Sequence, residues 1–146
     1  MVGKGKSMAL TVCKVEVFTA VIPNKVGEGA KVLCALTDAG VNLTAFWGYP
    51  LGKKAKTAAI ELIPETAAGF GKIAKKAGLE IEKGVAFLIE GDDQPGAVAA
   101  LMGALAAAGI NVDAVKAMQT GEGKFRAGIF VGKEDVRKAA KVLGAN

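Results

Sequence analysis

The side chains that most enzymes use for catalysis are scarce in this chain. Histidine does not occur, and cysteine occurs only as Cys13 and Cys34. These numbers exclude a Ser-His-Asp triad, a Cys-His dyad, a metal site built on imidazole and a four-cysteine zinc site. Lysines and carboxylates such as Lys14, Glu16 and Glu61 remain, but the sequence shows no catalytic partner for them. We therefore expect neither an enzyme nor a bound metal or cofactor.

A short polar turn offers a different chemistry. It precedes an alanine-rich stretch that we predict to be helical, and its residues are Asp93, Gln94, Pro95 and Gly96. The first backbone amides of a helix have no helical acceptor, so an anion bound there gains on the order of 1 kcal/mol. A glycine lets the ligand approach the backbone, and a neighbouring carboxylate can receive an ammonium group. This combination suits a molecule with both charges, such as a free amino acid, and the candidate contacts are Asp93, Gln94, Gly96, Ala97 and Asn111.

The same residues also have purely structural interpretations. Asp93 can serve as the N-cap of the helix, Pro95 is a favoured residue of a first helical turn, and Asn111 can stabilise a turn through its amide. Both interpretations remain open at the level of the sequence.

The chain repeats itself with an offset of 69 residues. Eleven positions between residues 10 and 47 recur identically, against about four expected by chance in so alanine-rich a chain. Beyond a lysine-rich turn the repeat continues with one residue of slippage, aligning 57–63 with 125–131, and then aligns 70–77 with 136–143. The recurring residues are Leu10, Lys14, Phe18, Gly27, Ala30, Ala35, Leu36, Ala39, Gly40, Asn42 and Ala45.

The first repeat contains a counterpart of the polar turn, with different residues. Its candidate contacts are Asn24, Gly27, Glu28 and Asn42. Asn24 replaces the acid and Val26 replaces the proline, while Glu28 suits the helix dipole but repels a ligand carboxylate. We therefore expect two unequal sites, the first of them degenerate or adapted to another ligand.

Each repeat changes its hydrophobic periodicity in the same order. In the second repeat, 85–89 has strand character, 97–108 carries a helical apolar stripe, and Gly109 is placed to end that helix. Two strands, 110–118 and 125–131, then flank a glycine-containing turn, and 134–143 forms a second helix. With one closing strand, each repeat becomes a β-α-β-β-α-β unit with an antiparallel sheet and both helices on one face.

The closing strands predict an exchange between the two units. The second repeat stops soon after its last helix, whereas each 69-residue repeat begins with the strand that would complete the other sheet. We expect a first domain at 9–78 closed by 79–83, and a second domain at 84–146 closed by 9–13.

This combination of features resembles tandem ACT domains. The resemblance covers residues 9–146 and rests on the duplication, on the turn before each first helix, and on the endings Gly40-Val41-Asn42 and Gly109-Ile110-Asn111. It implies a ferredoxin-like α+β fold and a stand-alone regulatory module that binds a small molecule, commonly an amino acid, at an interface between two ACT domains. A homodimer and a regulated enzyme are the partners that the resemblance implies. The alternative is a module that senses nothing and only joins subunits or binds a partner protein.

Charge and hydropathy argue against other partners. The net charge is +5, and the excess lies in residues 1–83, partly in Lys53, Lys54 and Lys56. Nucleic-acid binding is not expected, because the chain has two arginines and its aromatic residues are not interleaved with basic ones. The uncharged run 94–112 is interrupted by glycine, proline and asparagine, so we read it as a helix and a strand rather than a membrane span.

The predicted location is the cytoplasm. Two cysteines without a scaffold pattern suit buried thiols in a reducing compartment, and residues 1–7 lack the apolar run of a signal peptide. The glycine-lysine-serine sequence at 5–7 has no strand before it and therefore does not form a phosphate-binding loop. Residues 1–7 play no part in the fold assignment.

An aromatic cluster marks the hairpin of the first repeat. Phe46, Trp47, Tyr49 and Pro50 occur where the second repeat has Lys116 and Met118. Core packing, a subunit interface and the cover of a pocket are all compatible with such a cluster.

Overall fold

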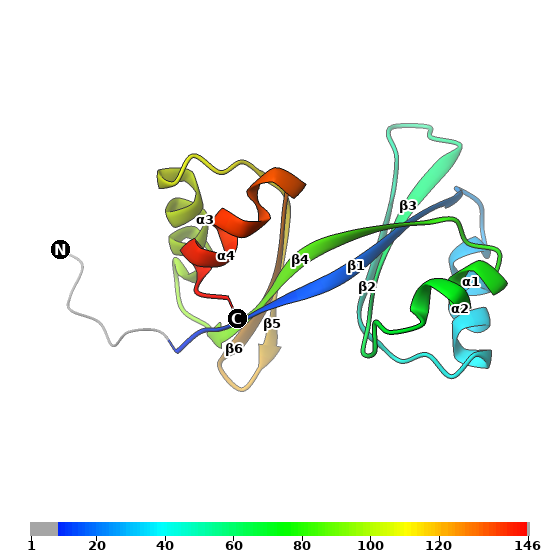
Figure 1. The fold of residues 1–146 in the computed structure, drawn as a ribbon, viewed down its shortest axis with the longest axis horizontal. Coiled ribbons are helices and arrows are strands. Elements are labelled where there is room, and N and C mark those ends of the chain that lie inside the picture. The colour runs from blue at the N-terminus through cyan, green and yellow to red at the C-terminus, as the bar shows by residue number, and fades with distance from the viewer. Residues whose placement is uncertain (1–8, 146) are drawn as a thin grey trace. The chain divides into compact units, whose positions relative to one another are not determined.

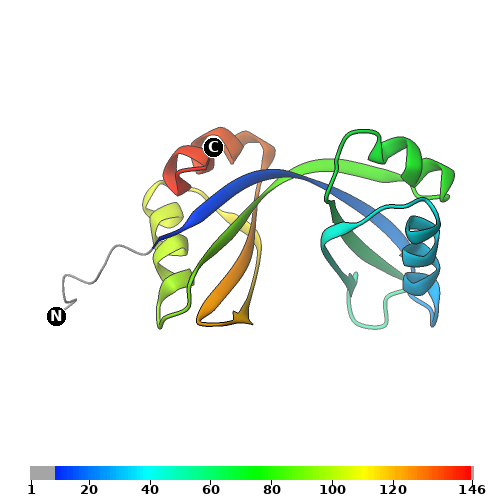
Figure 2. The ribbon, with the colours of Figure 1, turned by 90° about the horizontal axis from the view of Figure 1, so that it is seen from below.

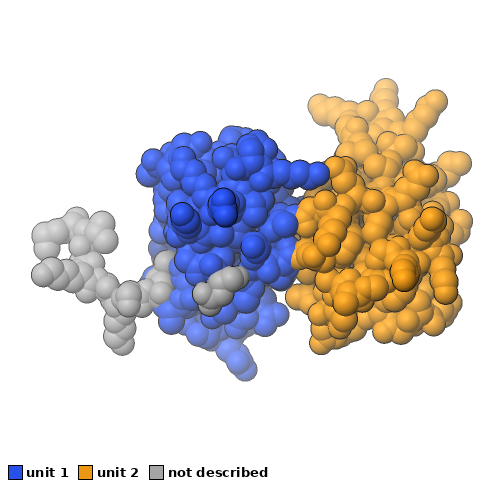
Figure 3. Space-filling view, viewed as in Figure 1, with its two compact units in different colours: residues 1–15, 85–146 blue, residues 16–84 orange. Residues whose placement is uncertain are grey.

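The computed structural model describes residues 9–145, so the segment 1–7 lies outside the described residues. The chain divides into two compact units (Figure 3). Among the described residues, unit 1 comprises 9–15 and 85–145, and unit 2 comprises 16–84. The first strand of the chain therefore contributes to both units.

Unit 2 is built mainly from the first repeat (Figure 1). β1 and β2 each pair with β3 in antiparallel register, and both helices lie on the same face of the strands. Its elements are β1 (Thr11–Pro23), α1 (Glu28–Asp38), β2 (Leu43–Pro50), β3 (Thr57–Pro64) and α2 (Phe70–Lys76).

Unit 1 has the same arrangement in the second repeat. β4 and β5 pair with β6 in antiparallel register, and α3 and α4 cover one face (Figure 2). Its elements are β4 (Ile81–Asp92), α3 (Ala97–Ala107), β5 (Val112–Gly121), β6 (Lys124–Val131) and α4 (Val136–Leu143), with a short 3-10 turn at Lys133–Asp135 before α4. The order of hydrogen-bonded neighbours in the six-stranded sheet is β2-β3-β1-β4-β6-β5. The predicted fold class, two ferredoxin-like units with antiparallel sheets, is confirmed.

The core of unit 2 lies between its helices and one face of its strands. Every second residue of β1 and β3 faces the helices, and among them Phe18 and Leu62 are register partners that are both buried. The rings of Phe18 and Phe70 are 4.7 Å apart with an interplanar angle of 49°. Leu79 and Ile81, from the segment that follows α2, pack into the same core.

The core of unit 1 repeats this pattern with different residues. Phe87 and Ile129 are fully buried register partners, and Leu105 of α3 is buried against them. Val12 belongs to this core and Leu10 packs against it, although both precede the first repeat's helix by more than a dozen residues. The beginning of β1 therefore supplies apolar side chains to unit 1.

The strand register corrects the predicted alignment of the two repeats. Phe18 faces Leu62 and Phe87 faces Ile129, so β3 and β6 correspond with an offset of 67 residues. The predicted offset for 57–63 was 68, with one residue of slippage instead of two. A slip of one residue exchanges the two faces of a strand, and burial of one face therefore decides the register more strongly than residue identity.

The end of α3 follows the prediction. Gly109 has φ +73°, its N–H donates to the Ala106 carbonyl at 2.9 Å, and the Ile110 N–H donates to the Leu105 carbonyl at 3.0 Å. The uncharged run 94–112 is thus divided between α3 and the start of β5. Across residues 9–145, the helices are too short or too polar to cross a membrane.

Candidate functional site

The polar turn of unit 1 connects the end of β4 to α3. Gly96 is the N-cap residue, has φ +85°, and makes no side-chain cap. Asp93 therefore is not the N-cap, and Pro95 precedes the helix instead of standing in its first turn. The Asp93 N–H donates to the Gly123 carbonyl at 2.8 Å, which ties the turn to the β5–β6 hairpin.

The first backbone amides of α3 were expected to lack an acceptor, and the amide of Ala97 differs from this expectation. The Ala97 N–H donates to the Gln94 carbonyl at 3.2 Å within the turn. Val98 and Ala99 are the next two residues of α3, where a helix has no preceding carbonyl to offer. Of the first backbone amides of this helix, those of Val98 and Ala99 therefore remain to bind an anion, whereas that of Ala97 is used within the turn.

A surface cavity of about 340 Å³, largely open to solvent, lies beside this turn. Its volume falls at the lower end of the range typical of small-molecule sites. One wall is the turn and the start of α3, and the other is the facing surface of β5 and β6. The lining residues are Asp93, Gln94, Gly96, Ala97, Val98, Ala99, Ala117, Met118, Gln119 and Phe125.

The polar groups of the cavity come from two elements. The Gln119 Nε2 on β5 donates a hydrogen bond to the Asp93 carboxylate. Just outside the cavity, the Lys124 Nζ lies 2.5 Å from the Asp92 Oδ1, and this hydrogen bond raises the pKa of Lys124. Sequence reasoning missed Gln119, because its counterpart in the first repeat is Pro50 and no motif marks it.

Asn111 does not lie beside the turn, contrary to the prediction. It follows the C-terminal end of α3, whereas the turn precedes the N-terminal end. A helix of 11 residues is about 16 Å long. The four other predicted contacts of the second repeat line the cavity, and Asn111 is not among its lining residues.

In unit 2, the corresponding turn is hydrogen-bonded to the loop of the β2–β3 hairpin. The Asn24 Nδ2 donates to the Ala55 carbonyl at 2.9 Å, and the Asn24 N–H donates to the Lys56 carbonyl at 2.9 Å. Gly27 is the N-cap with φ +88°, and Glu28 lies 3.5 Å from the Lys31 Nζ. The side chain that replaces Asp93 therefore fastens a loop to the turn.

Asn42 also lies at the far end of its helix. Its Nδ2 donates to the Glu65 Oε2 at 3.0 Å, and the Glu65 N–H donates to the Asn42 carbonyl at 2.9 Å. These bonds join the start of β2 to the residue after β3. The structure thus separates Asn42 from Asn24, Gly27 and Glu28, which the sequence grouped with it.

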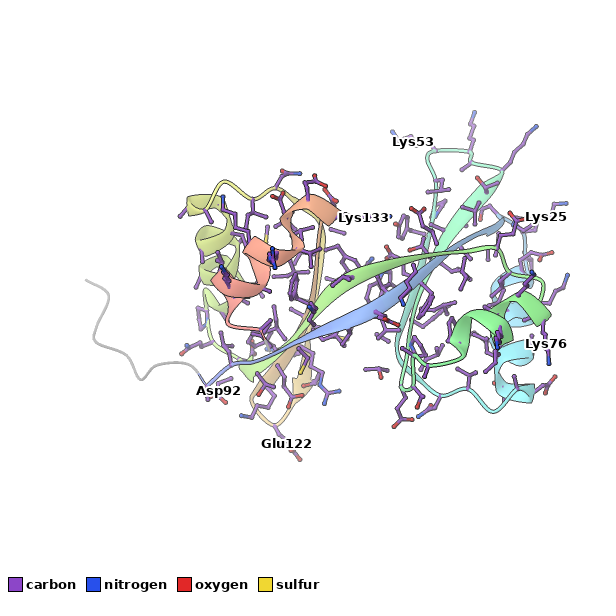
Figure 4. All side chains as sticks on the ribbon, viewed as in Figure 1. Lys25, Lys53, Lys76, Asp92, Glu122 and Lys133 are labelled. Atoms are coloured by element: carbon purple, nitrogen blue, oxygen red, sulfur yellow. The ribbon has the colours of Figure 1, made fainter. Side chains whose placement is uncertain are left out.

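The helix-free face of unit 2 holds a buried carboxylate. Trp47 and Glu61 are register partners, and the Trp47 Nε1 donates to the Glu61 carboxylate, which is 8% exposed. Tyr49 stands two residues along the same face of β2, and its pKa is raised by burial and by the Glu61 carboxylate. Phe46 points to the other face and is 37% exposed. Side chains of both units are drawn in Figure 4.

Comparisons with known proteins connect the chain to others through its fold. No protein-family model and no curated protein matches the sequence. Among solved structures, the regulatory subunit of aspartate kinase from Thermus thermophilus, in its ligand-free form, has a TM-score of 0.61 and 17% identity and covers 95% of each chain. The chain has the fold of an aspartate kinase regulatory subunit.

Two further structures support this assignment of the fold. A protein from Bacteroides thetaiotaomicron has a TM-score of 0.77 and 20% identity, covering 91% of this chain and 88% of its own. The aspartokinase alpha and beta subunits have a TM-score of 0.61 and 17% identity, covering 92% and 93%. These neighbours include regulatory subunits, and this chain spans nearly their whole length.

Proposed function

We propose that this protein is a tandem ACT-type regulatory protein that binds a free amino acid at the polar turn of unit 1. The observation that carries the proposal is the cavity beside that turn, which places the Asp93 carboxylate next to the first turn of α3. The fold shared with aspartate kinase regulatory subunits supports a regulatory role over a catalytic one.

The cavity offers a separate partner for each part of an amino acid. The ligand carboxylate binds at the amides of Val98 and Ala99, where the helix dipole favours negative charge. The ligand ammonium replaces the Gln119 amide at Asp93, which is a charge-assisted and therefore stronger hydrogen bond. Ala117 and Phe125, which share the face of β5 and β6 that the helices cover, provide an apolar wall for the ligand side chain.

The turn of unit 2 is the weaker site in this proposal. Its side chain at the position of Asp93 is the neutral Asn24, whose amide donates to a loop carbonyl. The Glu28 carboxylate in the first turn of α1 repels a ligand carboxylate. We therefore expect one strong amino-acid site in each chain.

A thermal-shift screen against the twenty amino acids tests the proposal. A ligand at a hundred times its dissociation constant stabilises the folded chain by about 2.7 kcal/mol, so one amino acid or a few related ones should raise the melting temperature. The variant Asp93→Asn should abolish the shift. Asp113→Asn, which removes an exposed carboxylate from β5 of the same unit, is the matched control and should keep it.

The screen has three possible results, and each bears on the proposed function or on the place of the site. A selective shift that Asp93→Asn removes supports amino-acid binding at this turn. A shift that Asp93→Asn retains moves the site elsewhere. The absence of any shift favours the alternative module that only joins subunits or binds a partner protein.

A further inference from the structure

The two units present equivalent loops at one end of their sheets. In unit 2 these loops are the turn 24–27 and the hairpin tip 51–56, which follow the register pair Pro23 and Thr57. In unit 1 they are the turn 93–96 and the tip 122–123, which follow the register pair Asp92 and Lys124. The equivalence allows the charges of the two ends to be compared position by position.

The end of unit 2 is basic. Four lysines stand on its two loops, and the bonds from Asn24 to residues 55 and 56 hold these loops together. The nearby Glu28 pairs with Lys31 of α1. We call the group Lys25, Lys53, Lys54 and Lys56 the basic end; Lys25 and Lys53 are labelled in Figure 4.

The end of unit 1 is acidic. Its hairpin tip reads Gly-Glu-Gly where unit 2 reads Gly-Lys-Lys-Ala-Lys, and the turn carries a carboxylate where unit 2 has Asn24. One lysine, Lys124, partly offsets these charges through Asp92. We call the group Asp92, Asp93 and Glu122 the acidic end; Asp92 and Glu122 are labelled in Figure 4.

The two tips place opposite charges on the same unusual backbone. Lys54 has φ +56° and Glu122 has φ +54°, and both residues are exposed. A residue with a Cβ in this left-handed conformation costs roughly 1–2 kcal/mol relative to glycine. Each hairpin therefore presents a charged side chain at its tip at some cost to stability.

Exposed apolar side chains accompany both ends. Val26, in the turn that carries Lys25, is fully exposed, and Leu51 before the lysine-rich tip is 49% exposed. Met118, beside the acidic turn, is 68% exposed. Apolar side chains inside a charged rim are the usual composition of a protein–protein interface.

We infer that the basic end of unit 2 binds the acidic end of unit 1 in a second copy of this chain. Opposite charges face each other in this contact, and the exposed side chains of Val26, Leu51 and Met118 become covered. The contact joins two different surfaces. If two chains make the contact in both directions, they close a symmetric dimer; if each pair of chains makes it once, the subunits form an open chain. The inference does not depend on a bound amino acid.

Sedimentation velocity of the full chain without ligand, over a range of protein and salt concentrations, tests the inference. The wild-type chain should associate, and added salt should weaken the association because it screens exposed charges. Lys53→Glu with Lys54→Glu, and separately Glu122→Lys, should raise the dissociation constant by roughly tenfold or more. An equimolar mixture of the two variants should restore association, because one contact of a mixed pair joins an unaltered basic end to an unaltered acidic end, and at the other contact the two reversed tips carry opposite charges.

The control variant carries Lys72→Glu and Lys141→Glu. It changes the net charge as much as the double reversal of the basic end, but both lysines are exposed on helices outside the two ends. It should associate like the wild type. Glu122→Lys should also keep the melting-temperature shift with the amino acid, since it leaves the cavity residues intact.

Three results would overturn the inference. These are a monomer at every concentration, association that both reversed variants retain, and a mixture that associates no better than its components. Each can occur together with a selective amino-acid shift, so this inference and the proposed function can fail separately.

Discussion

Trp47 stabilises the buried carboxylate of Glu61 on β3. Glu61 is 8% exposed, and an ionised group in such a position requires hydrogen-bond donors. The indole N–H of its register partner supplies one. In unit 1 the same pair of positions is Lys116 and Gly128, so this arrangement distinguishes the two repeats.

Replacing the indole donor should lower stability. Trp47→Phe keeps an aromatic ring on β2 and removes the N–H, which should reduce the free energy of unfolding by about 1–3 kcal/mol. Urea denaturation followed by circular dichroism measures the change. Phe46→Leu, on the other face of the same strand, is the control and should cost less; an equal loss in both variants would assign the effect to general packing.

The titration of Tyr49 should report the same carboxylate. Burial and Glu61 raise its pKa above the ordinary value of 10.0, so the folded chain keeps the phenolic proton to a higher pH than the unfolded chain. The corresponding stability is fully present below pH 10.0 and is lost as the pH rises through the folded pKa. Tyr49 is the single tyrosine, so tyrosinate absorbance measures it directly. Glu61→Gln should lower the midpoint, and an unchanged midpoint would leave burial as the whole cause.

At the scale of elements, backbone conformation at the glycine caps fixes how each strand enters its helix. Gly96 stands in the left-handed region between β4 and α3, and Gly27 does the same between β1 and α1. A Cβ at Gly96 would have no atom within 4 Å. Glycine is therefore required at this position because of the positive φ, and not because a larger side chain would lack space.

Alanine substitutions at the N-cap of α3 and inside α3 should separate the conformational requirement for glycine from helix propensity. Gly96→Ala should destabilise unit 1 by about 1–2 kcal/mol through its positive φ. Gly103→Ala, inside α3 with open space around it, should stabilise by about 0.5–1 kcal/mol through helix propensity. Thermal unfolding measures both, and equal effects at the two positions would contradict the conformational explanation.

At the scale of the whole molecule, the chain divides its first strand between two cores. Val12 is buried in unit 1, while Phe18, six residues later in β1, is buried in unit 2. Leu79 and Ile81 supply unit 2 from the segment that leads into β4. We propose that the units are two ACT-like domains, 9–78 and 84–146, each completed by the strand segment that precedes the other.

Deleting residues 9–13 should test this exchange. Hydrogen exchange should accelerate more in α3 and α4 than in α1 and α2, because the deletion removes Leu10 and Val12 from the core of unit 1. Leu79→Ala, which opens the core of unit 2, should give the opposite pattern. Faster exchange confined to unit 2 in the deletion variant would refute the exchange.

The sequence by itself determined what depends on neighbouring residues. The duplication, the order of strands and helices, and the end of a helix at Gly109 follow from periodicity and local backbone preference. Four of the five residues predicted at the second turn line the cavity, because these four lie close to one another in the sequence of the turn.

Tertiary structure decided what depends on residues distant in the chain. Gln119 reaches Asp93 across 26 positions, because the pairing of β4, β6 and β5 brings them together. Asn111 and Asn42 were misplaced because a helix carries the chain to the opposite end of its unit. The offset of β3 against β6 likewise required strand register, since shared residue types cannot indicate which face of a strand is buried.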